Sequence, residues 1–300
     1  MSEELNCNEV EEEECKLQQK FIQWSSSDNK VFLPSQRTTK RLSSGIYEIH
    51  QSQNVGTYFQ KIEADLTGLV SFAGSNADIV VSEIQKFWTR EQKFRKVKLP
   101  FKRGILLYGP PGSGKTCTIK LVIKNLICDH HGVVVKFTQP ALFVSAMRTF
   151  REIQPHTPVI VLMEDMDNIL ENYYESEVIN ILDGVDTFDK VVYLATTNYP
   201  EKLSDRILNR PSRFDRRFYI GTPSEMERMV YIKTISEGVS KIQISKWVKD
   251  TDGFTIAHIK ELFISVEVMG DDYDKSLAYL KEMKKKITSE SDGQKVGLNA

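Results

Sequence analysis

The stretch that decides the fold of this chain is Gly109-Pro110-Pro111-Gly112-Ser113-Gly114-Lys115-Thr116, which matches the phosphate-binding loop pattern G-x-x-x-x-G-K-[ST]. Its glycines allow backbone N–H groups to turn inward and surround phosphate oxygens. Lys115 is expected to reach the β- and γ-phosphates of a nucleotide, and the Thr116 hydroxyl to hold Mg²⁺. These residues, with Cys117 directly after them, form the predicted nucleotide-binding set.

The sequence on either side of this loop places it between a strand and a helix. Residues 105–108 form a short apolar run bounded by Gly104 and Gly109, which predicts a buried strand. Residues 118–126 have the apolar spacing of a helix, whose positive end would face the phosphates. The alternative is a chance glycine-rich turn, and the order of strand, loop and helix argues against it.

Further apolar runs alternate with helical segments through residue 222. They cover residues 133–137, 159–163, 191–195 and 217–220. This rhythm predicts an α/β domain over 76–222, with a doubly wound, mostly parallel sheet. Ligands of such sheets lie at the carboxyl ends of the strands, where the remaining motifs of this chain also fall.

Segments of different character flank this domain. Residues 223–288 have helical patterns and predict a C-terminal helical lid, and residues 289–300 predict a flexible polar tail. Residues 1–20 are acidic and predict a disordered tail. Residues 21–75 alternate short β-like runs with turn residues and predict a small strand-rich N-terminal module, in which no chemistry is recognisable.

The composition excludes several classes of protein. The chain has 300 residues, 40% hydrophobic and 27% charged, with a formal net charge of −1. No global field therefore favours nucleic acid or an anionic membrane. No apolar run approaches the roughly 18 residues of a membrane helix. The four cysteines have no metal or redox spacing, so a soluble protein of the reducing cytoplasm is expected.

Two neighbouring carboxylates follow the strand at 159–163. They are Glu164 and Asp165, in the string Glu164-Asp165-Met166-Asp167. One carboxylate can hold Mg²⁺, partly through water, while the next polarises an attacking water molecule. A solvated acidic loop is the alternative, and the phosphate-binding loop upstream favours the metal site.

Two more motifs suit phosphoryl chemistry. Asn198 ends the apolar strand that includes 191–195, where it can orient the attacking water or contact a γ-phosphate. Arg210 and Arg213 lie near Pro211, and a fixed guanidinium stabilises charge that spreads over a transferring phosphoryl group. Strand-ending Asn and surface Arg also have ordinary roles, in turns and in salt bridges.

Together these elements resemble an AAA+ ATPase of the AAA clade. The loop at 109–116 resembles Walker A of P-loop NTPases, 163–167 resembles Walker B, 195–198 resembles sensor 1, 210–215 resembles the second region of homology, and 253–262 resembles the lid segment. The resemblance covers about residues 78–270. It implies that Asn198 is the sensor and that Arg210 and Arg213 reach the ATP of a neighbouring subunit. It also implies a homo-oligomeric ring, most often a hexamer.

The chain departs from the usual pattern of this family in several places. Glu164 and Asp165 stand in swapped order, as in Bcs-type members, which makes Asp165 the expected base. Phe143 has no glycine after it, so a helix packed on the core is expected there rather than a threading pore loop. Ile256 and Ala257 leave no charged second sensor. Unlike the membrane-anchored mitochondrial Bcs-type translocase, the chain resembles soluble members of that branch.

The sequence therefore predicts an Mg²⁺-dependent ATPase that binds and hydrolyses ATP and remodels or translocates an unidentified protein client as a ring. One alternative is a regulatory or assembly module that hydrolyses slowly because Asp165 is a short base. A nucleic-acid motor or loader is a weaker alternative, since the basic clusters are modest. A small-molecule kinase would need neither the arginine pair nor the lid segment.

Overall fold

The structure is a computed structural model that describes residues 23–25, 33–35, 38–53, 56–66, 69, 75–184, 187–236 and 241–293. The chain divides into two compact units, Met1–Leu42 and Ser43–Ala300. In the first unit, β1 (Gln23–Ser25) pairs with β2 (Leu33–Ser35) in antiparallel fashion. The predicted tail at 1–20 and the end of the C-terminal tail, 294–300, lie outside the described residues.

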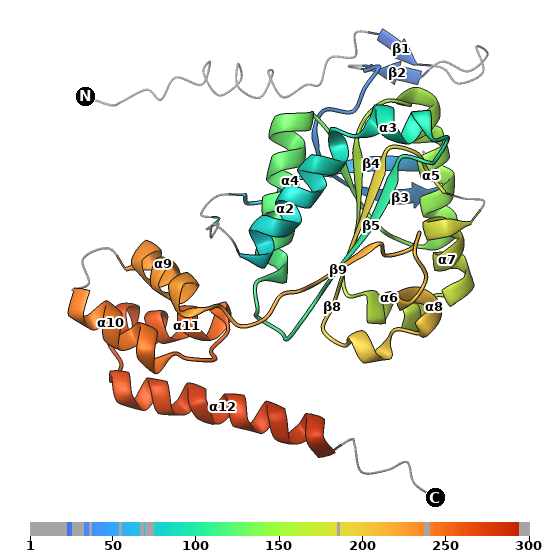
Figure 1. Cartoon of the computed structure of the whole chain (residues 1–300). Coiled ribbons are helices and arrows are strands. Elements are labelled where there is room, and N and C mark those ends of the chain that lie inside the picture. Colours follow the sequence, from blue (N-terminus) through green and yellow to red (C-terminus); the bar gives the residue numbers. More distant parts are fainter. Residues whose placement is uncertain are drawn as a thin grey trace, which may run out of the picture. The chain divides into compact units, whose positions relative to one another are not determined.

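The second unit is built on a seven-stranded, mostly parallel sheet (Figure 1). In order across the sheet, the strands are β4 (Gly56–Ile62), β3 (Gly45–Ser52), β6 (Val133–Lys136), β7 (Val159–Met163), β8 (Val191–Thr197), β5 (Lys102–Tyr108) and β9 (Arg216–Tyr219). Within this seven-stranded sheet, only β3 and β4 pair in antiparallel fashion. The predicted α/β class is confirmed.

The hairpin of β3 and β4 extends this sheet beyond β6. Strand β3 runs parallel to β6, with Gly45 opposite Val133. Ile46, Tyr47 and Ile49 of β3 are buried, and a strand with this much buried apolar surface is stabilised by packing within a larger sheet. Strands expected in an N-terminal module are thus continuous with the nucleotide domain, while the domain boundaries themselves stay a prediction.

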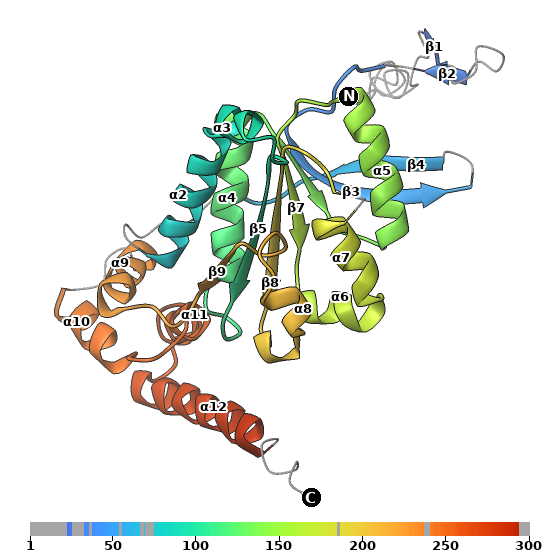
Figure 2. The ribbon, with the colours of Figure 1, turned by 45° about the vertical axis from the view of Figure 1, so that its right-hand side comes forward.

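Helices cover both faces of the sheet (Figure 2). Helices α2 (Asn76–Trp88) and α4 (Lys115–His130) lie on one face, and α5 (Pro140–Ile153) and α7 (Glu175–Asp183) on the other. Residues 76–96 form two helices: α2 ends at Trp88, and α3 (Glu91–Lys96) begins after a turn. Phe143 is fully buried in α5, which confirms its predicted packing role.

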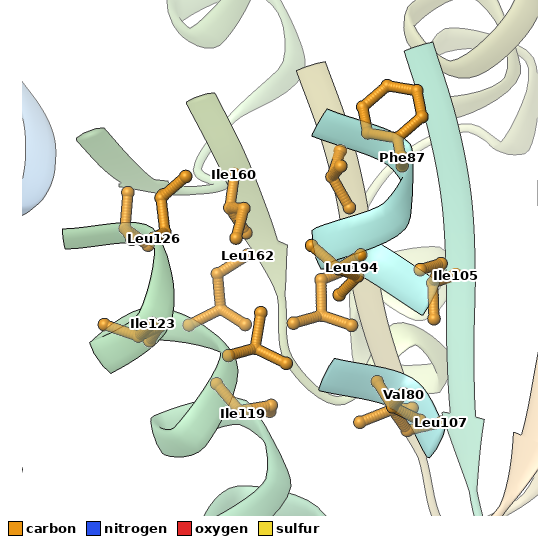
Figure 3. Packing of buried hydrophobic residues seen from close by; sticks show 14 of the residues in the cluster. Val80, Phe87, Ile105, Leu107, Ile119, Ile123, Leu126, Ile160, Leu162 and Leu194 are labelled. Carbon is orange, nitrogen blue, oxygen red and sulfur yellow. The ribbon is translucent and has the colours of Figure 1, made fainter. Parts of the chain in front are cut away.

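The main core lies between the sheet and α2 and α4 (Figure 3). Alternate residues of each central strand point into it, such as Ile105 and Leu107 of β5. The residues between them, such as Leu106, are equally buried against the opposite face. Phe87 stacks on Phe101 at a ring-centroid distance of 4.2 Å at one end of this core. Burial on both faces explains why these strands are continuous apolar runs.

The lid is a separate bundle of helices with its own core. It comprises α9 (Glu225–Ile235), α10 (Lys241–Asp250), α11 (Ile256–Phe263), the π-helical turn η2 (Ile264–Val268) and α12 (Tyr273–Gly293). Trp247, Phe254 and Leu262 are among the buried residues at its centre. Helix α12 extends to Gly293, beyond the predicted helical region 223–288. Among the described helices, none has the length and apolar character needed to cross a membrane.

Candidate nucleotide-binding site

The phosphate-binding loop joins β5 to α4, as predicted, and needs its glycines. Gly109, Gly112 and Gly114 have φ of +150°, +71° and +109°, which side-chain-bearing residues rarely adopt. A Cβ at Gly109 would lie 2.1 Å from the carbonyl oxygen of Ile220. At Gly114 a Cβ would meet nothing within 4 Å, so only the backbone conformation requires glycine there. Helix α4 begins directly after Gly114, and no side-chain hydrogen bond caps its first turn, so its first N–H groups are available to an anion.

Lys115 connects the loop to the predicted sensor. Its Nζ donates to the carbonyl oxygens of Gly109 (2.7 Å) and Pro110 (3.0 Å) and to Oδ1 of Asn198 (2.6 Å). The residue is only 8% exposed, and this burial lowers the pKa of its ammonium, against the raising effect of Asp165 and Asp167. The structure thus brings Asn198 of the β8 end to the loop, as the sequence predicts for a shared ligand edge.

The predicted carboxylates follow β7 at the same edge of the sheet. Glu164 and Asp165 are both exposed, and Asp165 has a left-handed backbone with φ of 50°. Its N–H donates to Oγ1 of Thr196 at 3.1 Å. Asp167 is buried and accepts a bond of 2.7 Å from the Thr197 hydroxyl. The sequence motif Glu164–Asp167 includes Asp167 but predicts no function for it. In the structure, its hydrogen bond to Thr197 holds the turn that carries the two exposed carboxylates.

Thr116 and Glu164 are the predicted metal ligands, and both are exposed. The described residues contain no group of three His, Cys, Asp or Glu side chains arranged to hold a metal ion. Mg²⁺ in nucleotide enzymes is usually held by one or two carboxylates together with water and substrate phosphates. One hydroxyl and one neighbouring carboxylate beside a phosphate-binding loop fit that donor set.

A cavity of about 260 Å³ lies next to the loop. It is lined by the start of α2, the start of α4, the segment after β9 and the lid, with Ser75, Asn76, Ala77, Ser113, Gly114, Cys117, Thr118, Ile220, Gly221, Thr222, Pro223, Glu227, Tyr231 and Ile256. Burial, and Cys117 nearby, raise the pKa of Tyr231. Ser113, Gly114 and Cys117 of this wall belong to the predicted nucleotide-binding set, and Ile256 belongs to the segment that resembles the lid. Most of the other lining residues come from segments that are far apart in the sequence and carry no motif.

The cavity and loop together fit a nucleotide. The cavity has apolar walls for a base, and the loop beside it has free space where backbone groups converge. The Ser113 hydroxyl is buried and has no hydrogen-bond partner among the described residues, so it is open to a ligand. The residues present therefore suit a base at one end and phosphates at the other.

Comparison with known proteins agrees with this geometry. Residues 105–222 match the family model described as ATPase family associated with various cellular activities (AAA). These residues form an AAA ATPase domain. The predicted resemblance is confirmed, and the segments predicted to correspond to Walker A, Walker B and sensor 1 all lie within the matched residues.

The relatives of this chain include proteasome regulatory subunits and a mitochondrial chaperone. A probable 26S proteasome regulatory subunit 10B of Caenorhabditis elegans is 32% identical over 189 residues, 56% of this chain and 46% of that protein. The Dictyostelium discoideum subunit 10B is 29% identical over 233 residues (68% and 59%). A probable mitochondrial chaperone bcs1 of Schizosaccharomyces pombe is 32% identical over 165 residues (50% and 36%). The chain thus spans about half the length of the curated relatives it matches.

The two arginines of the AAA domain have different environments. Arg210 is exposed. Arg213 is only 4% exposed; its guanidinium donates to the carbonyl oxygen of Arg206, and its Nε lies 3.8 Å from Oδ2 of Asp183. The predicted action of the two arginines on a neighbouring subunit stays a prediction.

The lid contacts the phosphate-binding loop of the AAA domain directly. The N–H of Ala257 donates to the Gly112 carbonyl oxygen at 3.3 Å, and a Cβ at Gly112 would lie 2.8 Å from that of Ala257. Thr255 caps α11, and its Oγ1 is 2.6 Å from Nδ1 of His258. Burial and the charge of Lys284 lower the pKa of His258. No charged side chain occupies 256 or 257, so the lid meets the loop through backbone and small apolar groups.

Proposed function

We propose that this chain binds ATP with Mg²⁺, hydrolyses it between the copies of a ring, and uses the resulting change in contacts to remodel or translocate a protein partner. The observation that carries this proposal is Lys115, bonded at once to the loop and to Asn198 at the end of β8; the exposed Glu164 and Asp165 follow the neighbouring strand β7. The relatives support a protein client, since they are named as proteasome regulatory subunits and a mitochondrial chaperone.

Each residue has a distinct part in this proposal. The loop amides and the start of α4 bind the phosphates, and Lys115 exchanges its carbonyl partners for phosphate oxygens. Thr116 and Glu164 would hold Mg²⁺, which neutralises charge on the phosphates when bound. Asp165 accepts the proton of the attacking water, and Asn198 orients that water or contacts the γ-phosphate.

The active site is completed by a second copy of the chain. Arg210 is exposed on the segment between α8 (Asp205–Leu208) and β9, away from its own Lys115 contacts. A guanidinium supplied by a neighbour stabilises charge that develops on the transferring phosphoryl group. This arrangement makes hydrolysis depend on assembly, as in a hexamer-like ring.

The test is ATPase activity against protein concentration, with Arg210→Ala and Lys115→Met measured singly and as a mixture. Specific activity is expected to rise with concentration, and each variant to be inactive alone. An equimolar mixture should regain activity, because Arg210→Ala copies keep an intact loop and Lys115→Met copies supply Arg210. Activity that does not depend on concentration, with no recovery on mixing, would contradict the ring proposal.

A slow regulatory or assembly module is a second candidate, favoured by the conformation of Asp165. The Asp165 carboxylate is exposed, and the residue has a left-handed backbone conformation. Because the Asp side chain is shorter than that of Glu, it would lie farther from the attacking water. The Asp165→Glu variant separates the two candidates. A large gain in turnover supports the slow module, whereas unchanged or lower turnover supports a working ATPase with Asp165 as its base.

A further inference from the structure

The segment that carries both arginines is fixed to the body of the AAA domain by Arg213. This side chain is buried and bonds to the carbonyl oxygen of Arg206, the second residue of α8. Its Nε lies 3.8 Å from Oδ2 of Asp183, the last residue of α7. Arg210, three residues earlier, is exposed. Arg213 therefore contacts its own chain, while the Arg210 side chain is exposed to solvent.

Asp183 holds a second cation on its other oxygen. Its Oδ1 lies 3.6 Å from Nζ of Lys102, the first residue of β5. Lys102 Nζ also donates to the carbonyl oxygen of Leu182 at 2.5 Å. Burial lowers the pKa of Lys102, while Asp183 and Asp215 raise it. The end of α7 thus lies between the start of β5 and Arg213.

The backbone of the same segment packs directly on β5. The carboxylate of Asp215 accepts from the N–H of Gly104 at 2.9 Å and from that of Ser212 at 3.2 Å. Gly104 is required here, since a Cβ on it would lie 1.6 Å from the carbonyl oxygen of Arg213. Side chain and backbone of Arg213 are therefore both engaged within the chain, at the opposite end of β5 from the phosphate-binding loop.

We propose that Arg213 is a positioning residue: its contact with Asp183 fixes the segment that presents Arg210, and Arg213 itself does not reach a neighbour's nucleotide. Moving it outward would leave Asp183 without one of its cations and would break the bond to Arg206. Asp183 is partly exposed, but the Arg213 guanidinium is buried, so losing its partners is costly for that charge, whereas Arg210 can meet a neighbour without losing any buried contact. The role of Arg210 in this statement rests on the proposed function.

Trypsin cleavage of the Arg213–Phe214 bond tests the position of Arg213 without any need for ATP turnover. The Arg210–Pro211 bond resists trypsin because of its proline, so a cut in this segment reports on Arg213. We expect slow cleavage in the wild-type chain and about tenfold or faster cleavage in Asp183→Ala, because cleavage follows the population of the opened segment. Glu175→Gln is the matched control: it weakens the 3.6 Å pair with Arg206, whose own side chain is 66% exposed, so this pair contributes little.

Turnover separates positioning from direct contact. We expect Arg213→Ala and Asp183→Ala each to lower kcat with little change in the KM for ATP, and the double variant to lose no more than Arg213→Ala alone. Arg213→Lys should recover part of both kcat and trypsin resistance, since an ammonium can still pair with Asp183. If Arg213 instead contacted the neighbour's phosphates, the losses of kcat in Arg213→Ala and Asp183→Ala would add in the double variant.

The proposal is overturned if trypsin cleaves Asp183→Ala at the wild-type rate and this variant hydrolyses ATP like the wild-type chain, while Arg213→Ala has no ATPase activity. It is equally overturned if Glu175→Gln opens the segment as much as Asp183→Ala does. Absence of all ATPase activity, with cleavage still accelerated by Asp183→Ala, would remove the proposed function and leave the anchoring of this segment established.

Discussion

The two ends of strand β5 use polar groups in opposite ways. At its carboxyl end the chain turns through Gly109, with backbone N–H groups and Lys115 available to a ligand. At its amino end, Lys102 and Gly104 are bonded to Asp183 and Asp215 of the same chain. The polar groups at the carboxyl end can exchange their partners within the chain for a ligand, whereas those at the amino end are bonded to carboxylates of the same chain. A change at the amino end should therefore affect stability, and a change at the carboxyl end should affect turnover.

Gly104→Ala should have the largest effect on folding. Its new Cβ would lie 1.6 Å from a backbone oxygen, and backbone cannot move aside as a side chain can. We expect a loss of about 4 kcal/mol or more in the free energy of unfolding, measured by denaturant titration. Gly114→Ala is the control from the other end: with open space around it, only its φ of +109° is strained, at about 1–2 kcal/mol. Equal losses in both variants would remove the contrast between the two ends.

Lys115→Met should leave the fold intact and remove turnover. Burial already disfavours the charged form of Lys115, so a neutral side chain of similar length should not lower the free energy of unfolding. Turnover should fall about 10²–10³-fold, as when a preorganised group at developing charge is removed. Parallel ATPase and thermal unfolding measurements check this, and a large loss of stability would show that the carboxyl end is also structural.

Asn198→Ala should have a smaller effect at the same end. It removes one of the three acceptors of the Lys115 ammonium and the predicted contact to water or γ-phosphate. Turnover should fall about 10- to 100-fold, which corresponds to one hydrogen bond to a charged group. Nucleotide affinity, measured by calorimetry, should change less than kcat. An equal loss in both would mean that Asn198 acts only in binding.

His258 should give the smallest effect, seen only in acid. Its pKa is lowered in the folded chain, mainly by burial and also by Lys284, so the unfolded chain binds the proton more readily. The resulting stability is complete above the ordinary His pKa of about 6.5 and is lost as pH falls below it. His258→Asn should therefore lose less stability than the wild-type chain between about pH 7.5 and about pH 5.5. An identical acid loss in both chains, measured by thermal unfolding, would contradict this.

The sequence predicts what is encoded locally. Gly109 to Thr116 require a particular backbone, and apolar runs that end in Glu164 and Asn198 must bring those residues to one edge of a parallel sheet. The burial of Arg213 is different, because it depends on Asp183, which is distant in sequence and in no shared motif. The cavity beside the loop and the pairing of β3 with β6 are equally long-range, and no residue pattern in those segments specifies their partner.

The strand order also has a consequence for synthesis on the ribosome. Strand β5 pairs only with β8 and β9, so its neighbours begin about 80 residues after it ends. At about 5–20 residues per second, this strand waits roughly 4–16 s for its first partner. Ile105, Leu106 and Leu107 are exposed during that time, although all three are fully buried in the finished fold. The strand that leads into the phosphate-binding loop is thus also the part of the nascent chain most in need of protection from aggregation.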